Sequence, residues 1–259
     1  LLDRMKERVD TPDAVIALLE ARDADARSIA EVDGRLRLGA LVTLSQIAVN
    51  DVVRTHLPAL AEAAGQAASF QIRNRATLGG NLAQHTRCGY YRHASFPCFK
   101  RGDAECPVLK DGAVQDTAGV YGNAACASAH PSSIAPVLLA AGADVTLLTG
   151  ERKDARRTRP LSELWQAPQR GRASDTVLGP GHVLAALSVP LGGDATRVGY
   201  AEVRQKQAFD WALASCAVGL RRGGDGKVSA QVWLGSVAPT PHRAVAAETL
   251  LSSGPRPRR

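Results

Sequence analysis

The sequence is poor in aromatic side chains, contains a single methionine and has no long apolar run. Aromatic residues make up 4% of the 259 residues and hydrophobic residues 45%, which predicts a core of small aliphatic side chains in a domain of mixed helices and strands. No apolar stretch approaches the ~20 residues that cross a bilayer, and no basic and apolar leader opens the chain. We therefore expect a soluble protein with no membrane contact and no signal peptide of its own.

Positive charge is in excess, but no nucleic-acid motif accompanies it. The formal net charge is +7, and much of the excess lies in three runs: ERKDARRTR at 151–159, Arg170 with Arg172, and the final PRPRR. No platform of aromatic residues, of the kind that stacks on bases, is interleaved with these runs. We interpret them as solvated surface and expect no nucleic-acid partner.

The first part of the chain predicts strands and helices in alternation. Leu36, Leu38 and Ala40 alternate as in a strand, and Thr43 or Ser45 is placed to cap a helix after it. A helical pattern follows at 56–69, whereas 11–21 fits a short strand or one helical turn. The sequence therefore opens as a mixed α and β domain.

A second set of elements follows the same logic. We expect a helix at 132–143, capped by Ser132 or Ser133 and ended by Gly142, then a strand at 144–150, loops and a short helix at 152–181, and a strand at 183–190. Beyond this, the pattern predicts a strand at 197–205, a helix at 210–221 that carries Cys216, a hairpin around 223–227 and a strand at 229–238. We place a domain boundary between 192 and 193.

The segment ATLGGNL, at 76–82, has the composition of a ligand-holding turn. Gly79 and Gly80 lack a Cβ, so backbone N–H groups can approach a ligand, and Thr77 and Asn81 add side-chain donors. The spacing matches neither the Rossmann nor the P-loop pattern. A pyrophosphate-holding loop and an ordinary turn both remain open.

Four of the five cysteines fall in a single polar segment of 39 residues: Cys88, Cys98, Cys106 and Cys126. Nine, seven and nineteen residues separate them, so the close C-x2-C to C-x4-C pairs of structural zinc sites are missing. An iron-sulfur cluster, two disulfides, a zinc site and unliganded thiols all remain open on the residues alone. Arg87, Lys100 and Arg101 lie beside the thiols and favour their ionised form.

Other titratable residues point to no catalytic centre. His85, His93 and His130 lie near the cysteines and are placed either to contact a cofactor edge or to stand in a polar loop. Ser, His and Asp residues occur at no spacing diagnostic of a nucleophile and its base. We therefore predict no catalytic residue in this chain.

Several segments resemble the flavin-binding subunit or domain of the molybdenum hydroxylases, the group that includes xanthine dehydrogenase and carbon monoxide dehydrogenase. These segments are QIRNRATLGGNLAQ, SSIAPVLLAAGADVTL and VLAALSVP. TRCGYYR, CFKRGDAEC and NAACASAHPSSIAP resemble a narrower branch, the flavin subunits of periplasmic aldehyde oxidoreductases and 4-hydroxybenzoyl-CoA reductases, which carry an extra 4Fe-4S cluster. The resemblance covers nearly the whole chain.

The resemblance implies an α+β fold with two domains. Residues 1–192 would form an FAD-binding domain of the vanillyl-alcohol-oxidase type, with an iron-sulfur loop insertion at 85–130. Residues 193–259 would form an α/β C-terminal domain like that of carbon monoxide dehydrogenase flavoproteins. The resemblance further implies that both domains are truncated, with the first FAD loop preceding Leu1. The residues it assigns to FAD are Thr77, Leu78, Gly79, Gly80, Asn81, Ser133 and Leu184, and those it assigns to the 4Fe-4S cluster are Cys88, Cys98, Cys106 and Cys126.

By the same resemblance, the chain is an electron-transfer subunit of a molybdenum-dependent aldehyde oxidoreductase, or of a related xanthine dehydrogenase-like enzyme. The implied partners are a large molybdopterin-binding subunit, a small 2Fe-2S subunit and an external electron acceptor, in a heterotrimer or its dimer. We expect export to the periplasm with a partner subunit, or a cytoplasmic location. The alternative is a non-enzymatic module whose four cysteines hold zinc or disulfides and whose basic surface binds a partner.

Overall fold

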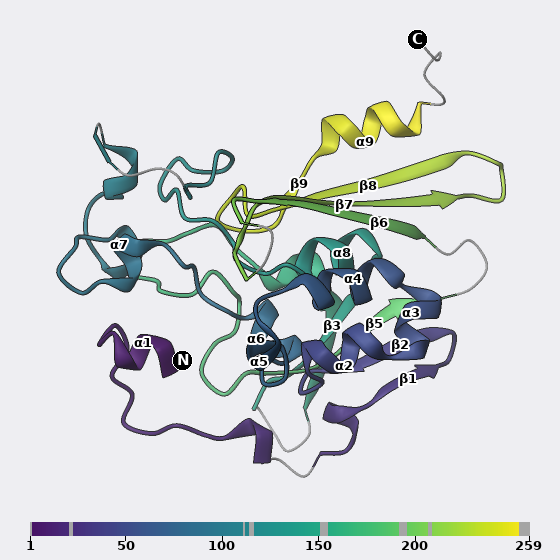
Figure 1. Ribbon diagram of the computed structural model, residues 1–259, viewed down its shortest axis with the longest axis horizontal. Coiled ribbons are helices and arrows are strands. Elements are labelled where there is room, and N and C mark those ends of the chain that lie inside the picture. The colour runs from purple at the N-terminus through teal and green to yellow at the C-terminus, as the bar shows by residue number, and fades with distance from the viewer. Residues whose placement is uncertain are drawn as a thin grey trace.

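The computed structural model describes residues 2–20, 23–110, 112–113, 117–150, 155–191, 196–206 and 209–253. Two antiparallel sheets enclose a layer of helices, and a lobe of turns and short helices extends to one side (Figure 1). The predicted boundary falls within 192–195 and the basic tail within 254–259, and both lie outside the described residues.

The first sheet has five antiparallel strands in the order β1-β2-β5-β3-β4. The strands are β1 (Ile29–Val32), β2 (Arg35–Gly39), β3 (Asp144–Leu148), β4 (Arg156–Pro160) and β5 (Val183–Pro190). The alternation predicted for β2 is confirmed, because Leu36 and Leu38 are fully buried and pair with Val189 and Leu187 of β5. β4 lies where we predicted loop. Its arginine-rich, largely exposed side chains show no apolar alternation, and pairing with β3 alone makes it an edge strand.

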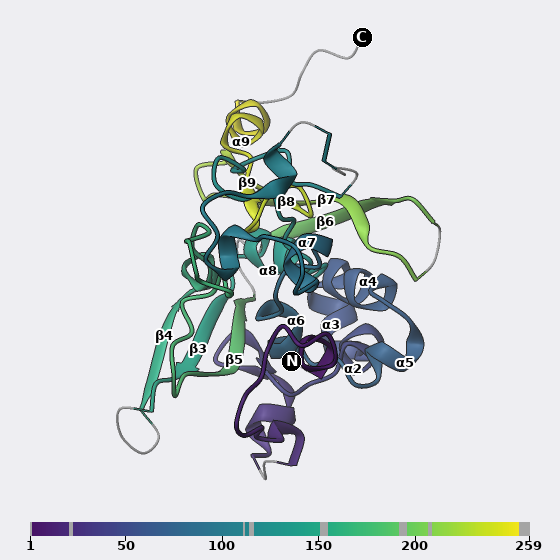
Figure 2. The same ribbon diagram turned by 90° about the vertical axis from the view of Figure 1, so that its left-hand side faces the viewer.

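Short helices cover one face of this sheet (Figure 2). They are α2 (Leu44–Val49), α3 (Asp51–His56), α4 (Pro58–Gln66), α5 (Phe70–Arg73), α6 (Leu78–Leu82) and α8 (Ala135–Ala140). Thr43 caps α2 as predicted, in a capping box where its Oγ1 accepts from Gln46 N at 3.2 Å and Gln46 Oε1 accepts from Thr43 N at 2.9 Å. Among the described residues, every helix is too short or too polar to cross a membrane.

The helix predicted at 132–143 is confirmed as α8. Ser132 Oγ accepts from Ala135 N at 3.1 Å, and Gly142 takes the left-handed conformation after the helix at φ +70°. Single 3-10 turns occur elsewhere in the first part of the chain: η1 (Leu18–Glu20), η2 (Asp25–Arg27) and η5 (Leu161–Leu164). The segment at 11–21 therefore supplies one helical turn rather than a strand.

The second sheet has the order β6-β7-β8-β9, also antiparallel. Its strands are β6 (Arg197–Arg204), β7 (Ala212–Arg222), β8 (Val228–Gly235) and β9 (His242–Arg243), and α9 (Val245–Ser252) follows. The helix predicted at 210–221 is wrong, because those residues form β7, the strand that pairs with both β6 and β8. The hairpin around 223–227 is confirmed.

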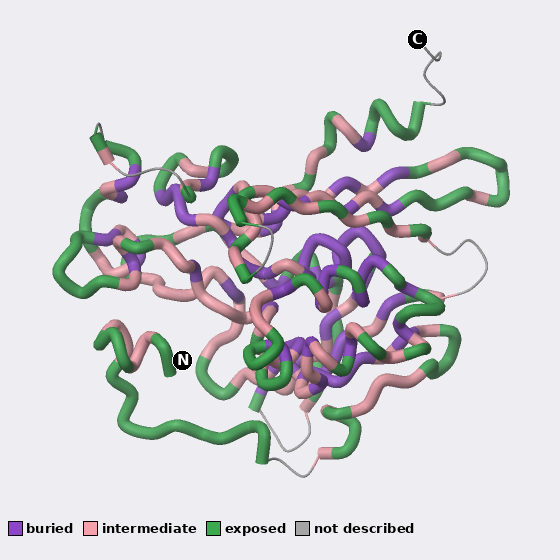
Figure 3. The backbone as a smooth tube through the Cα atoms, in the orientation of Figure 1, coloured by how far each residue is buried: buried purple, intermediate pink, exposed green. Residues whose placement is uncertain are grey.

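The core lies between the two sheets, where α4 and α8 pack (Figure 3). Its members come from both halves of the chain: Leu60 of α4, Leu138 of α8, Leu147 of β3 and Ala217 of β7 are each at most 1% exposed. Burial of this kind contributes roughly 25 cal/mol per Å² of apolar surface. The helices therefore join the two sheets through one continuous apolar core.

The side lobe contains the cysteine-rich segment and is built from turns. Its short elements are α7 (Gly89–Arg92), η3 (Phe99–Arg101) and η4 (Pro107–Leu109). It has a small apolar cluster of its own around Val108 and Ala127. The N-terminal helix α1 (Leu2–Lys6) lies beside the lobe, and Glu7 just after it pairs with Arg92 at 2.6 Å.

Candidate functional site: a divided cleft beside a four-thiol lobe

The TLGGN segment forms the first turns of α6 and lies against the end of β2. Thr77 is the N-cap of α6, and its Oγ1 accepts from Gly80 N at 3.1 Å. A Cβ at position 79 would lie 3.1 Å from Ala40 Cβ and 3.2 Å from Ala40 O. Glycine at 79 therefore allows α6 to pack closely against the strand end.

The backbone N–H groups of residues 78–81 all donate to acceptors within the protein. Leu78 N donates to Val42 O at 2.8 Å, Gly79 N to Ala40 O at 2.9 Å, and Asn81 N to Thr77 O at 2.8 Å. With Gly80 N bonded to Thr77, all four N–H groups from 78 to 81 are used within the protein. Side chains must therefore supply the donors for a ligand here.

A cavity of about 580 Å³ opens beside α6. Four of the residues assigned to FAD line it: Thr77, Gly80, Asn81 and Ser133. Leu78, Gly79 and Leu184 are buried beneath them and do not line it. The cavity wall also carries four arginines, Arg4, Arg75, Arg87 and Arg92, of which Arg4, Arg87 and Arg92 are paired with Asp10, Asp3 and Glu7.

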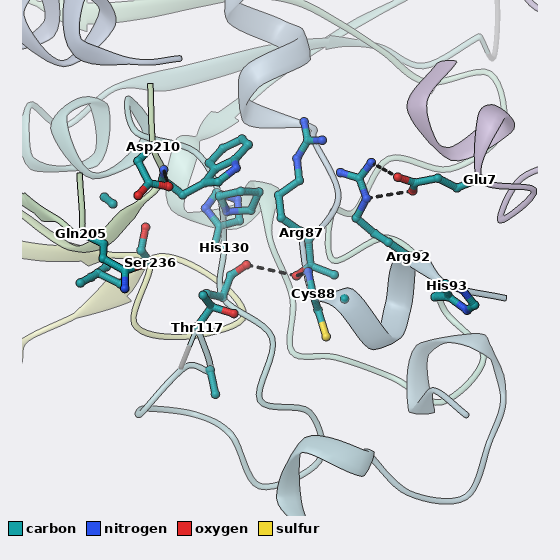
Figure 4. A pocket seen from close by; sticks show the side chains of 18 of the residues that line it. Glu7, Arg87, Cys88, Arg92, His93, Thr117, His130, Gln205, Asp210 and Ser236 are labelled. Atoms are coloured by element: carbon teal, nitrogen blue, oxygen red, sulfur yellow. Dashed lines mark hydrogen bonds and ion pairs between the residues drawn. The ribbon is translucent and has the colours of Figure 1, made fainter. Parts of the chain in front are cut away.

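A second cavity of about 1000 Å³ adjoins the first and reaches Cys88 (Figure 4). Five residues line both cavities: Thr86, Arg87, Arg92, Asp210 and Trp211. The two spaces therefore form one elongated cleft that runs from α6 to the cysteine lobe. Volumes of about 580 and 1000 Å³ leave room for an extended ligand.

The side chains of Arg87 and Trp211 meet where the two cavities join. The Arg87 guanidinium lies 4.9 Å from the Trp211 ring centroid and 2.8 Å from Asp3 Oδ2. The Nε atom of Arg87 is buried without a hydrogen-bond partner. Neither residue was among the predicted binding residues, and Trp211 was hidden because we assigned its segment to a helix.

The structure brings the four cysteines of the lobe together. Cys88, Cys106 and Cys126 share one apolar cluster, and Cys98 interacts electrostatically with Cys126. Cys98, Cys106 and Cys126 are buried, Cys88 is half-buried, and all five cysteines of the chain are free thiols. Cys216 lies apart on β7.

The thiols differ in their proton affinity because burial and hydrogen bonding act on them unequally. Burial raises the pKa of Cys88 and of Cys98, although backbone N–H groups that point at each sulfur oppose the shift. The hydrogen bond from Cys126 lowers the pKa of Cys106 to about 6, and the same bond raises the pKa of Cys126. The lobe can therefore hold thiolate charge at Cys106 near neutral pH.

Within the described residues, no three Cys, His, Asp or Glu side chains lie close enough together to hold a single metal ion. A tetrahedral zinc site needs Zn–S distances of ~2.3 Å, which places its sulfurs less than ~4 Å apart. In a polynuclear cluster each thiolate binds a different iron atom, so the sulfurs stand farther apart. Three of the four lobe thiols are buried and Cys88 is half-buried, and backbone N–H groups point at the sulfurs of Cys88 and Cys98.

Two chain segments tie the cleft to the lobe. One runs from α6 to Cys88 and the other from Cys126 to Ser132. The Thr86 hydroxyl lies between them, accepting from Cys88 N at 3.2 Å and donating to Ala129 O at 3.3 Å. At the other end, Ser132 Oγ donates to Asn81 Oδ1 at 2.6 Å.

The three histidines near the cysteines occupy different environments. His93 is exposed, whereas His85 bonds to the Tyr91 hydroxyl at 2.8 Å, and burial lowers its pKa to about 4. His130 is 3% exposed and packs edge-on against Trp165, and burial lowers its pKa to about 3. Neither ring nitrogen of His130 has a hydrogen-bond partner in the part of the chain that the structure describes. His85 and His130 are therefore neutral at physiological pH.

Residues 1–192 match the family model described as the FAD binding domain in molybdopterin dehydrogenase. The chain belongs to this family. The FAD-binding domain covers the first sheet, the helices, the cysteine lobe and the residues assigned to FAD, and it supports FAD as the cofactor of the cleft. The predicted family and mixed fold are confirmed.

Known members resemble this FAD-binding protein over most of its length. The aldehyde oxidoreductase FAD-binding subunit PaoB of Escherichia coli strain K12 is 34% identical over 256 residues, covering 98% of this chain and 77% of the relative. The carbon monoxide dehydrogenase medium chain of Hydrogenophaga pseudoflava is 26% identical over 240 residues, covering 93% and 65%. The chain thus spans 77% of the length of the first relative and 65% of the length of the second.

Solved structures show the same fold. A carbon monoxide dehydrogenase chain from Hydrogenophaga pseudoflava superposes with a TM-score of 0.61 at 28% identity, covering 92% of this chain and 64% of that chain. A chain of the Cu,Mo-CO dehydrogenase superposes with a TM-score of 0.67 at 24% identity, covering 97% and 69%. The relatives are subunits of molybdenum hydroxylase oxidoreductases, which places this chain among the subunits of such enzymes.

Proposed function

We propose that this chain is the FAD- and 4Fe-4S-binding electron-transfer subunit of a molybdenum-dependent aldehyde oxidoreductase. The observation that carries the proposal is the four-thiol lobe at one end of the cleft whose other end holds the TLGGN segment. The 34% identity to an aldehyde oxidoreductase FAD-binding subunit over 98% of the chain supports the choice of enzyme class.

In this proposal, side chains of this chain bind FAD and the cluster. Thr77, Asn81 and Ser133 offer side-chain donors, and the arginines of the cleft neutralise a pyrophosphate. The four lobe cysteines hold the cluster; Cys98, Cys106 and Cys126 are buried, and Cys88 faces the larger cavity. When bound, FAD and the cluster carry electrons, which is chemistry that no side chain of this protein supplies.

Substrate oxidation belongs to other chains in this scheme. The proposed partners are a large molybdopterin-binding subunit and a small 2Fe-2S subunit, in a heterotrimer or its dimer, with an external acceptor taking electrons from this chain. The relatives' names, an FAD-binding subunit and a medium chain, support such an assembly. We propose a periplasmic location by co-export with a partner, with a cytoplasmic location as the alternative.

The test is anaerobic purification of the protein with its two partner subunits. The expected result is stoichiometric FAD, with four iron and four sulfide beyond those of the small subunit. Cys106→Ser should remove that iron and leave FAD in place, whereas Cys216→Ser, a matched change of a thiol outside the lobe, should remove neither. Zinc in place of iron, or disulfides that block alkylation of the four lobe cysteines, would contradict the cluster.

FAD binding is tested separately from the cluster. Gly80 lines the cavity of about 580 Å³, and a Cβ there would already lie 3.0 Å from Thr77 Oγ1. Gly80→Val should therefore displace the Thr77 cap and place apolar methyl groups in the cavity wall. The expected result is a loss of flavin fluorescence released on denaturation with unchanged iron content.

A further inference from the structure

A buried ion pair stands inside the cysteine lobe. Lys100 follows Cys98 by two residues in η3, and its Nζ donates to Asp175 Oδ2. The side chains of Lys100 and Asp175 are 1% and 9% exposed. Asp175 belongs to the segment at 165–176, which packs against the lobe from the side of the first sheet.

Stability alone does not account for this pair. Transfer of two charges from water to a buried site costs free energy that their mutual attraction only partly offsets, so buried ion pairs contribute little net stability compared with apolar residues of the same size. Among the described residues, Asp175 Oδ1 also has no hydrogen-bond partner. A group kept at such cost points to a role of the charge itself.

The pair fixes the turn that carries Cys98. Two further bonds join this turn to the segment at 165–176: Gly171 N donates to Phe99 O at 3.0 Å, and Arg170 Nε donates to Gly102 O at 2.8 Å. Backbone N–H groups of Lys100 and Arg101 in turn point at the sulfur of Cys98. Lys100 is therefore held at a set position relative to the Cys98 thiol.

The positive charge of Lys100 affects the pKa of other groups in and around the lobe. It adds to the effect of burial in lowering the pKa of both His130 and His85, and it partly offsets the rise in the pKa of Cys126. Lys110, another lysine of the lobe, is 63% exposed and pairs with Glu105, which is 70% exposed. Water and salt screen a charge at Lys110 far more than one at Lys100.

We propose that Lys100, held by Asp175, is a positioning residue that supplies a fixed buried positive charge beside the thiolates and raises the reduction potential of the group they bind. The proposal rests on the proposed cluster. Reduction adds one negative charge to the group, and a nearby buried cation favours the reduced form because attraction is weakly screened in the interior. Asp175 anchors that cation and partly offsets its field.

The test compares charge-removing variants in the complete complex by a redox titration monitored by electron paramagnetic resonance. Lys100→Met removes the charge and keeps the length of the side chain, and it should lower the equilibrium constant for reduction about tenfold, about 59 mV for a one-electron couple. Asp175→Asn should shift the potential in the opposite direction. Lys110→Met, the matched control, should leave it unchanged.

A merely structural role would not shift the reduction potential in opposite directions in Lys100→Met and Asp175→Asn. Equal potentials for wild type, Lys100→Met and Asp175→Asn, or equal shifts for Lys100→Met and Lys110→Met, would overturn the inference and leave the cluster in place. Wild-type protein without the additional iron would overturn the proposed function together with this inference. If Lys100→Met does not assemble, the sign for Asp175→Asn decides: a shift to higher potential supports the inference, and no shift overturns it.

Discussion

Gly219 is one of the positions at which the second sheet touches α8, and its substitution tests how closely the two are packed. A Cβ at 219 would lie 2.2 Å from Ala140 O and 2.8 Å from Thr196 Cγ2, whereas real Cβ contacts are not shorter than 3.0 Å. The nearest atom is a helix carbonyl, which cannot rotate away as a side-chain end can. Gly219→Ala therefore requires β7 and α8 to separate by about 0.8 Å, the difference between 2.2 and 3.0 Å.

The cost follows from two opposing effects. Overpacking of this size destabilises a core by about 1–3 kcal/mol, and replacing glycine in a strand returns about 0.5–1 kcal/mol of conformational entropy. Gly199 on β6 has no atom within 4 Å of the position a Cβ would take, so Gly199→Ala receives only the favourable effect. At about 2–4 °C per kcal/mol for a chain of this size, we expect Gly219→Ala to melt a few degrees below wild type and Gly199→Ala at or above it.

Thermal unfolding followed by circular dichroism measures both variants, and flavin content provides a second readout. α8 begins just after Ser133, which lines the cleft, so movement of α8 away from β7 should also lower FAD retention. Equal melting temperatures for Gly219→Ala and Gly199→Ala would refute the close approach of β7 to α8.

Two further predictions concern buried polar groups. Glu248 Oε1 accepts from Val232 N at 2.9 Å and from Arg243 Nε at 3.0 Å, so Glu248→Ala should destabilise the protein by about 1–3 kcal/mol in urea unfolding, and Glu248→Gln, which keeps an acceptor, by less. Burial lowers the pKa of His130 from about 6.5 in the unfolded chain to about 3 in the folded protein. The neutral imidazole therefore contributes its full stabilisation of the folded state above pH 6.5, and this stabilisation is lost as the pH falls toward about 3. His130→Phe should therefore lose less stability between pH 7 and pH 5 than wild type, and equal losses would contradict the buried neutral imidazole.

Local chemistry predicted the elements that carry an unambiguous pattern. The alternation at Leu36 and Leu38 identified β2, and Thr43 identified the start of α2 through its capping box. β7 was misjudged because ALASCAVGL has small apolar residues at both helical and strand spacing. Its conformation is decided by partners far along the chain, namely β6, β8 and the backbone of α8 against Gly219.

The candidate site likewise contains residues that the sequence identifies and residues that only the fold brings together. The residues of the TLGGN turn and the four cysteines stand out by type and spacing, whereas Arg87, Trp211 and the pair of Lys100 with Asp175 do not. Lys100 and Asp175 are 75 residues apart and meet only because the segment at 165–176 packs on the lobe. The role of the glycines also depends on the fold, since Gly79 serves close packing against Ala40 rather than an N–H cradle.

The cleft and the lobe are mechanically one unit, because the same two segments build both. From Asn81 to Cys88 the chain passes from the FAD-binding turn to the first thiol, and from Cys126 to Ser132 it returns from the last thiol to the same turn. The Thr86 hydroxyl joins these segments near the lobe and the bond between Ser132 and Asn81 joins them at the turn, so they cannot slide independently. The distance between the two candidate cofactor positions is therefore set by these two segments, and His130 N, which donates to Ala238 O at 2.8 Å, ties one of them to the loop that follows β8.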